Sequence, residues 1–311
     1  MKRMAIRFEI VTIFPGFFTG FLENGILRRA QTEGLVTVGV HDLRAFTHDR
    51  HRTVDDRPFG GGEGMVLKPE PIARALDLLG IAAKAERALS SPTLAPEVLR
   101  EGGATSFEVS PESRAGLSDR QICAELTRVI LLSAQGRPFT QAVARELSRL
   151  DRVVLLCGRY EGVDERINEL YCDMELSIGD YVLSGGELAA AVVVDATMRL
   201  VPGVLGNEAS GEFESFGVPD DLISSEEEGV PRSQHGAGGL LDYPHYTRPA
   251  EFGGLRAPDV LMNGDHLQIR RWRREQQLRK TMTNRPDLLD RASLSEEDRK
   301  LLKVIQEKEL A

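Results

Sequence analysis

Strand-like and helix-like segments alternate along the first two-thirds of the chain, and this alternation constrains the fold more than any other feature. Short runs of β-branched and apolar residues, which predict strands, fall at 6–14, 35–43, 128–136, 152–160 and 174–183. The segments with a helical period lie between them, at 15–34, 69–79, 140–150 and 163–171. Strands that alternate with helices predict a parallel sheet covered on both faces, and so an α/β fold.

The rest of the chain departs from this alternation. An apolar helix is predicted over 187–206, ended by Pro202 and Gly203. The acidic, glycine-rich stretch after it is typical of a linker, and the charged C-terminal segment has a helical pattern almost throughout. We expect a core domain at 1–205 that contains an insertion at 81–127, with possible short helices but no strand. A flexible linker at 206–239 and a small helical domain at 240–311 follow it.

Composition excludes several classes of protein. No apolar run approaches the roughly 20 residues that span a bilayer, and Arg7 and Glu9 interrupt the start of the chain where a signal peptide would be apolar. The three cysteines lack CxxC spacing, which argues against a disulfide framework or a zinc site and favours the reducing cytoplasm. The net charge of −9 decides little about nucleic acid, because bases cluster at 48–57 and 270–280.

Three glycine-marked turns follow three of the predicted strands: "LLSAQGRP" (131–138), "LLCGRYEG" (155–162) and "SIGDYVLSGGE" (177–187). The chain contains no GxxxxGK[ST] motif, so a standard P-loop is excluded. Ligands of open parallel sheets bind beyond the carboxyl ends of the strands. An ordinary strand-to-helix turn explains each loop alone, but the three together favour a small-molecule site with exposed backbone groups.

The segment 48–65 combines histidine, arginine, aspartate and glycine. His48, His51, Asp55 and Asp56 are possible metal ligands, but the interleaved arginines would repel a cation. A solvated charged loop explains the polarity but not the arginines beside glycines. Arginine forks and exposed backbone suit phosphates and base edges, so contact with nucleic acid is favoured over a metal.

Three further stretches carry weaker signals. Asp195 and Arg199 lie four residues apart on one helix face. They could form an internal ion pair, or Arg199 could stabilise a developing negative oxygen, and the sequence favours neither interpretation. The acids of 207–217 lie on a segment expected to be flexible, where a carboxylate could act as a general base once a partner buried it. The basic segment 269–280 surrounds the only tryptophan, Trp272, and resembles a surface that follows phosphates.

Six motifs together resemble the bacterial tRNA (guanine-37-N1)-methyltransferases of the knotted SPOUT superfamily. They stand in family order and cover most of the chain except 81–127 and about 217–237: "FTHDRHRTVDDRPFGGGEGM", "CGRYEGVDERI", "SIGDYVLSGGE", "PGVLGNEAS", "LLDYPHYTRP" and "GDHLQIRRWRR". The resemblance implies a SPOUT-type parallel sheet with a C-terminal trefoil knot, S-adenosylmethionine as methyl donor, tRNA as substrate, and a homodimer in which the partner subunit completes each site.

The resemblance also assigns roles to individual residues. The methyl donor is expected to contact the loop residues and one acid of the C-terminal segment, namely Ser133, Gly158, Tyr160, Glu161, Ile178, Gly179, Asp180, Tyr181, Val182, Leu183, Gly185, Gly186 and Asp242. The target base and its neighbours are expected to contact His48, Arg50, Asp55, Asp56, Arg57, Gly61, Gly62 and His245.

The catalytic pair implied by the resemblance is an acid in the linker and an arginine near the end of the core helix. Arg199 stands at the arginine position, and Glu214 stands where the family has aspartate, with Glu212 as a nearby competitor. Family members depend on Mg²⁺, yet the sequence shows no evident protein cage for it, which agrees with weak binding through one or two carboxylates. A knotted RNA-binding protein without catalysis, or a methyltransferase acting elsewhere on RNA, remains the alternative.

Overall fold

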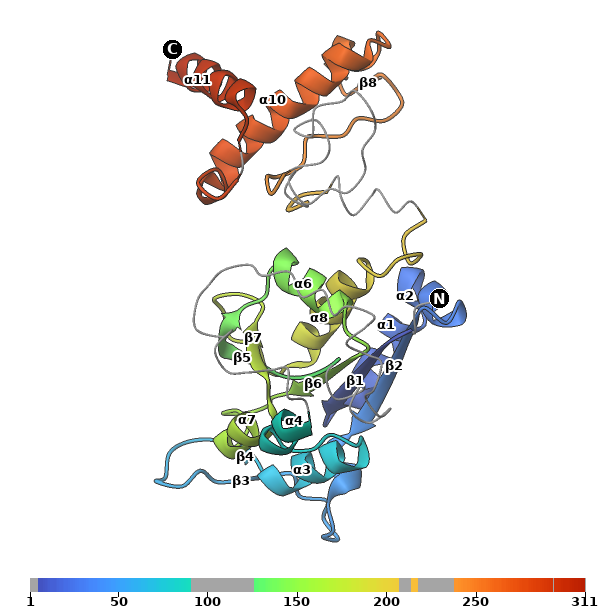
Figure 1. Cartoon of the computed structure of the whole chain (residues 1–311), viewed down its shortest axis with the longest axis vertical. Coiled ribbons are helices and arrows are strands. Elements are labelled where there is room, and N and C mark those ends of the chain that lie inside the picture. The colour runs from blue at the N-terminus through green and yellow to red at the C-terminus, as the bar shows by residue number, and fades with distance from the viewer. Residues whose placement is uncertain (1–4, 91–125, 207–213, 218–237, 293, 311) are drawn as a thin grey trace. The chain divides into compact units, whose positions relative to one another are not determined.

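Five parallel strands form one sheet in the order β2-β1-β6-β5-β7 (Figure 1). The strands are β1 (Ile6–Thr12), β2 (Val36–Asp42), β5 (Thr127–Pro138), β6 (Arg152–Cys157) and β7 (Met174–Ser177). The computed structural model of the chain describes residues 5–90, 126–206, 214–217, 238–292 and 294–310. It divides the chain into two compact units, Met1–Val204 and Leu205–Ala311, and the sheet belongs to the first.

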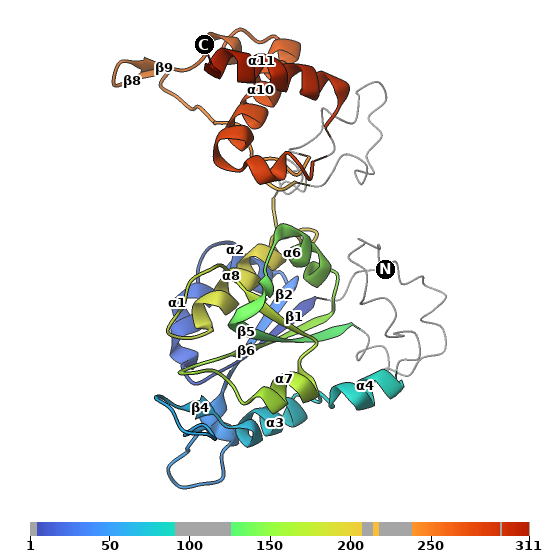
Figure 2. The ribbon, with the colours of Figure 1, turned by 90° about the vertical axis from the view of Figure 1, so that its left-hand side faces the viewer.

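Helices cover both faces of this sheet (Figure 2). On one face lie η1 (Pro15–Phe18), α1 (Thr19–Leu22), α2 (Gly25–Thr32), α6 (Gln141–Ser148) and α8 (Glu187–Met198). On the other lie η2 (Leu43–Phe46), α3 (Pro69–Leu78), α4 (Lys84–Ser90) and α7 (Glu165–Tyr171). The predicted α/β architecture is confirmed.

Apolar residues of β1 face both layers of helices. Phe8 and Ile10 are buried in the core under α8 and α6, whereas Val11 and the following Ile13 are buried in the core under α3 and α7. A strand between two layers of helices buries both of its faces, so the neighbouring residues Ile10 and Val11 are both apolar although their side chains point to opposite faces.

Several predicted elements differ in extent from the structure. The strands predicted over 152–160 and 174–183 end earlier, at Cys157 and Ser177, and three further differences have a local cause. The helical pattern of 15–34 is broken into η1, α1 and α2, because Gly25 adopts a positive φ of 61°. Helix α8 ends at Met198, not at Pro202, since the N–H groups of Leu200 and Val201 bond to carbonyls three residues back. Within the predicted insertion 81–127, α4 is described, and residues 91–125 lie outside the described part.

The third difference concerns β5, which does not end at its glycine-marked turn. The strand pairs with β7 on both sides of a bulge, since Leu132 and Arg137 both align with Leu176. A Cβ on Gly136 would lie 2.5 Å from the backbone nitrogen of Leu176. Only glycine therefore lets the chain return to the sheet this closely.

The second unit contains the helices α10 (His266–Asn284) and α11 (Glu296–Leu310), with the short turns η7 (Asp259–Leu261) and η8 (Pro286–Leu288). The prediction of an almost wholly helical segment over 240–311 was wrong for its first part, where β8 (Glu251–Phe252) and β9 (Leu255–Arg256) form a hairpin. Gly253 and Gly254 both have positive φ, as a tight hairpin turn requires. Leu240, Leu278 and Ile305 form the buried core of this unit.

Candidate functional site

The loops after β6 and β7 touch through their backbones at the carboxyl edge of the sheet. The Gly186 N–H donates to the Gly158 carbonyl over 2.9 Å, and Arg159 forms an isolated antiparallel bridge with Gly185. A Cβ on Gly186 would lie 2.7 Å from the Cα of Cys157. The two loops are therefore fixed by a contact that no side chain at position 186 could enter.

The bulge of β5 lies beside this contact. A Cβ on Gly158 would lie 3.4 Å from the Leu132 carbonyl oxygen, and Ser133 follows immediately. The Ser133 hydroxyl accepts a hydrogen bond from the Gln135 N–H over 3.1 Å, which holds the bulge in shape. The structure thus brings Ser133, Gly158, Gly185 and Gly186 into one region.

The first half of the loop 178–186 turns back on itself. The Ser177 hydroxyl donates to the Gly179 carbonyl over 3.0 Å, and the Tyr181 hydroxyl donates to the Ile178 carbonyl over 3.2 Å. Ile178 packs partly buried against the core. The remaining predicted contacts of this loop are half-buried at Gly179 and Leu183 and exposed at Asp180, Tyr181 and Val182.

The segment 48–65 is joined to the β6 loop at its far end. The Glu161 N–H donates to the Met65 carbonyl over 3.0 Å, and a Cβ on Gly64 would meet the Glu161 side chain. Burial, together with the charge and hydrogen bond of Asp55, raises the pKa of Tyr160 above its usual value. Asp55, predicted to contact the substrate, therefore lies against Tyr160, predicted to contact the methyl donor.

Two two-residue strands, β3 (Asp55–Asp56) and β4 (Val66–Leu67), pair antiparallel and close this segment into a loop. The substrate residues predicted within it that are exposed to solvent are His48, Arg50, Asp56, Arg57, Gly61 and Gly62. His48 also lines a cavity of about 450 Å³ with Lys68 and Arg74. The loop therefore presents basic side chains outward.

In the described ranges, no group of three or more His, Cys, Asp and Glu side chains is placed to hold a metal ion. Cys157 and Cys172 are buried free thiols, and burial raises the pKa of both above the usual value, that of Cys172 to about 12. No helix in the part of the chain that the structure describes is long and apolar enough to cross a membrane.

Arg199 lies at the C-terminal end of α8, where its N–H donates to the Asp195 carbonyl over 3.3 Å. A cation there also complements the helix dipole. Glu214, the predicted base, belongs to the second unit, and Glu212 lies outside the described residues. The catalytic pair predicted from the sequence is thus divided between the two units of one chain.

Within the second unit, Glu214 begins a turn whose next two residues bond to the segment that contains Leu240 and Asp242. The Ser215 hydroxyl accepts from the Asp242 N–H over 2.9 Å, and the Phe216 N–H donates to the Leu240 carbonyl over 2.9 Å. Nε2 of His245 lies 2.9 Å from a carboxylate oxygen of Asp242. Three residues with predicted roles therefore gather in one part of this unit.

Helix α10 carries the predicted basic surface, but not all its bases face solvent. Arg270, Arg271 and Arg273 are exposed, and the Arg273 guanidinium lies 4.8 Å from the centre of the Tyr243 ring. Arg274 instead forms a two-pronged ion pair with the nearly buried Asp298, at 2.8 and 2.9 Å. Trp272 is half-buried, with its ring 6.2 Å from that of Tyr246.

Sequence reasoning missed three residues that contact the glycine loops. Thr12 hydrogen-bonds Glu187 at the start of α8, and the ring of Phe14 lies 4.5 Å beneath the Arg159 guanidinium. Thr12 and Glu187 are 175 residues apart, so no local pattern could have paired them. The only available signal was the position of Thr12 at the end of a strand.

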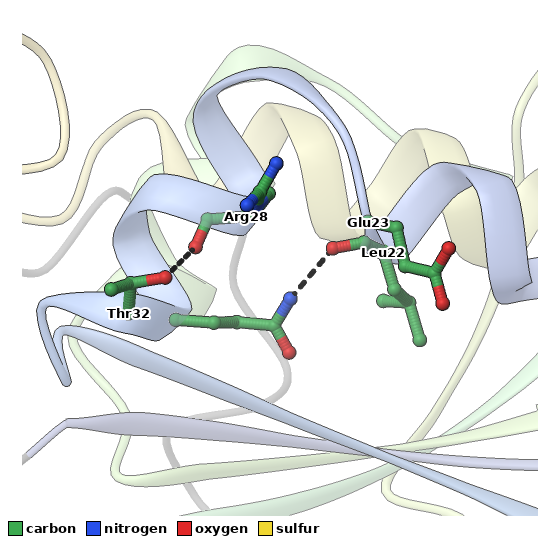
Figure 3. Close-up of a pocket in the computed structure, with 5 residues that line it drawn as sticks. Leu22, Glu23, Arg28 and Thr32 are labelled. Atoms are coloured by element: carbon green, nitrogen blue, oxygen red, sulfur yellow. Dashed lines mark hydrogen bonds between the residues drawn. The ribbon is translucent and has the colours of Figure 1, made fainter.

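A larger cavity of about 480 Å³ lies elsewhere, between α1 and α2 (Figure 3). Its polar groups bind their own backbone: Gln31 donates to the Leu22 carbonyl over 3.0 Å and Thr32 to the Arg28 carbonyl over 2.9 Å. This cavity contains none of the predicted site residues.

Comparison with known proteins identifies the family. The family model described as tRNA (Guanine-1)-methyltransferase TrmD matches residues 6–96 and 101–291. A tRNA (guanine-N(1)-)-methyltransferase of Koribacter versatilis is 51% identical over 96% of this chain and 97% of its own length. Proteins with the same name from Geobacter metallireducens and Dictyoglomus turgidum are each 43% identical, over 97% of this chain and 98% and 97% of their own lengths. The chain belongs to the tRNA (guanine-1)-methyltransferase family.

Proposed function

We propose that this protein transfers a methyl group from S-adenosylmethionine to N1 of guanine 37 in tRNA. One observation carries the proposal: the loops after β6 and β7 meet at the carboxyl edge of a parallel sheet through the Gly186–Gly158 backbone contact, beside the β5 bulge. Family membership and the names of the relatives supply the reaction.

The residues of these loops fit a donor that has no phosphate. They offer backbone donors and acceptors, apolar surface at Ile178 and Val182, and rings at Tyr160 and Tyr181. S-adenosylmethionine presents an adenine, an amino acid and a sulfonium whose methyl group is electrophilic. Loops of this composition suit the first two, and the reactive methyl would project from them toward the substrate.

A trefoil knot belongs to the same proposal. Two close backbone passages support it, one of Gly136 past Leu176 and one of Gly186 past Cys157, each too tight for a Cβ. Such passages are what a chain threaded through its own loops requires. We infer that the knot gives these loops their rigidity.

Chemistry at guanine requires a base and a cation. N1 carries a proton at neutral pH, and as the proton leaves, negative charge gathers on O6. Glu214 would accept the N1 proton, and Arg199 at the end of α8 would stabilise O6. The methyl group then forms a bond to N1 as its bond to sulfur breaks, leaving a neutral thioether and a protonated Glu214.

The division of this pair between two units supports a homodimer in which the second unit of one subunit completes the site on the other. Two apolar side chains of α8, Leu188 and Val192, are exposed to solvent, and they support a contact surface on this helix. The Asp242–His245 cluster would then approach the donor from the partner subunit. Glu214 would arrive with it.

The tRNA would bind the exposed basic loop 48–57 and the outward arginines of α10, with phosphates read by Arg50, Arg57 and Arg270. The described residues contain no group of three or more His, Cys, Asp and Glu side chains placed to hold a metal ion, so any Mg²⁺ would be held by one or two carboxylates. We place the reaction in the cytoplasm, in keeping with two buried free thiols.

The test is incubation of the full-length protein with methyl-labelled S-adenosylmethionine and either of two transcripts, a tRNA with guanine at position 37 and the same tRNA with adenine there. We expect label only in the guanine transcript, at N1. Donor binding without transfer would instead favour a knotted RNA-binding protein, and transfer to both transcripts would favour another target position.

A further inference from the structure

Two buried polar side chains lie under the loop 178–186. Thr12 is 1% exposed and Glu187 is 5% exposed, and the Thr12 hydroxyl donates to Oε1 of Glu187 over 2.7 Å. A carboxylate is costly to remove from water unless it is well bonded, so its retention here calls for a reason. The pair joins the end of β1 to the first residue of α8.

The surroundings stabilise the pair at this point. Glu187 occupies the first turn of α8, where the helix dipole favours a negative group. The Thr12 hydroxyl also accepts a hydrogen bond from the Phe14 N–H over 3.0 Å, which sets its orientation. The hydroxyl is thus used as both donor and acceptor.

The carboxylate lies directly against Gly185. A Cβ built on Gly185 would lie 2.5 Å from Oε2 of Glu187 and 2.8 Å from Cδ of Arg159. The next residue, Gly186, makes the backbone bond to Gly158 that joins the two loops. Glu187 and Arg159 therefore both occupy the space into which a side chain at position 185 would project.

A second connection runs from Phe14, two residues after β1, to the same two glycines. The Arg159 guanidinium donates to the Ser184 carbonyl and lies 4.5 Å from the centre of the Phe14 ring. Thr12 therefore bonds Glu187, which follows the two glycines. Phe14 contacts Arg159, which bonds the carbonyl of Ser184 just before them. No residue of β1 belongs to the three glycine loops.

We propose that Glu187 and Thr12 are positioning residues of the methyl-donor site: their hydrogen bond anchors the 184–186 end of the donor loop to β1. This inference rests on the proposed function for the identity of the ligand. The pair acts through Gly185 and Gly186 and does not need to touch the donor itself. Loss of the anchor is expected to weaken donor binding more than tRNA binding.

The test uses the full-length protein with Thr12→Val, which keeps the shape and removes the hydroxyl, and with Thr12→Ser, which restores it. We expect Thr12→Val to raise the KM and Kd for S-adenosylmethionine about tenfold, as loss of one buried hydrogen bond to a charged group predicts. The KM for tRNA should change less than about twofold, and Thr12→Ser should recover most of the donor affinity.

Glu187→Gln gives a second, gentler variant that retains an acceptor for Thr12. It should weaken donor binding less than Thr12→Val does. Thr127→Val is the matched control, because Thr127 is a buried threonine at the opposite end of the same sheet. It should lower the melting temperature without changing the Kd for the donor.

Amide hydrogen exchange gives a readout that needs no ligand. In Thr12→Val the Gly186 N–H should exchange faster, and in Thr127→Val it should not. If Thr12→Val lowers the melting temperature while donor Kd and Gly186 exchange match those of the wild type, the pair is only structural and the proposal fails. If the wild type binds no S-adenosylmethionine, the proposed function fails, whereas an unchanged Gly186 exchange would overturn the anchor itself.

Discussion

The glycine loops of the first unit and the acid-and-histidine cluster of the second are held together in opposite ways. The Gly186 N–H bonds to the Gly158 carbonyl, and a Cβ on Gly186 would lie 2.7 Å from the Cα of Cys157, too close for any side chain. Asp242 is held instead by side-chain bonds to Ser215 and His245. A site defined by backbone has one shape, whereas one defined by side chains can be changed atom by atom without disturbing the fold.

The most disruptive change to the structure is one that breaks the backbone contact itself. Gly186→Ala places a methyl group 2.7 Å from the Cα of Cys157 and 3.0 Å from the nitrogen of Gly158, and neither backbone atom can move away freely. We expect donor affinity to fall by about 100-fold or more. Calorimetric titration with S-adenosylmethionine measures it.

Gly20→Ala is the matched control for that variant, because a Cβ on Gly20 meets nothing within 4 Å and the residue lies in α1. It should bind the donor as the wild type does. Normal donor binding by Gly186→Ala would show that the two loops separate readily, and the contrast between the two regions would be lost.

A side-chain change in the second unit should affect catalysis and leave donor binding intact. Glu214→Gln keeps the turn, in which the Gly217 N–H donates to the Glu214 carbonyl over 3.0 Å, but removes the proposed base. We expect the rate of methyl transfer to fall by about 1,000-fold, within the range for loss of a general base. Single-turnover transfer to guanine-37 tRNA measures the rate.

Two further variants test whether Glu214 is the base. Glu214→Asp should retain most of the rate, because the carboxylate remains. Glu212→Gln, two residues away, should be near wild type. If Glu212→Gln lost activity and Glu214→Gln did not, the base would be Glu212.

The third effect concerns the stability of the second unit. Burial opposes ionisation of Asp298, but the hydrogen bonds and charge of Arg274 outweigh it, so the pKa of Asp298 lies below its usual 3.8. The pair therefore stabilises the second unit above that pH, and its contribution is lost as the pH falls through the lowered pKa. Asp298→Asn should cost about 3 kcal/mol at pH 7, because it leaves Arg274 nearly buried without its counter-charge.

Urea unfolding of the full-length protein at pH 7 and near pH 3 checks this. The wild type should lose stability between the two values more than Asp298→Asn does. Asp287→Asn provides the comparison, because its pair with Arg285 is exposed and should matter little. If Asp298→Asn and Asp287→Asn lowered the free energy of unfolding equally, the Arg274–Asp298 pair would not be a main source of stability in this unit.

Local pattern was enough for the sheet and its covering helices, because a strand buried on both faces leaves a continuous apolar run and each helix leaves a 3.6-residue period. It misjudged two places where glycine decides the backbone. "SAQG" read as a turn but forms a bulge within β5, and "EFGGLR" was absorbed into a helical pattern but forms a hairpin. In both, the glycines were visible while the partner segment was not.

The sequence by itself determined the α/β architecture, and its motifs determined the family. Tertiary structure alone decided that Thr12 bonds Glu187, that Asp55 lies against Tyr160, and that Arg274 is committed to Asp298. The physical reason is range. Periodicity and turn chemistry report on neighbours within a few residues, whereas a hydrogen bond across 175 residues depends on how the strands are ordered in the sheet.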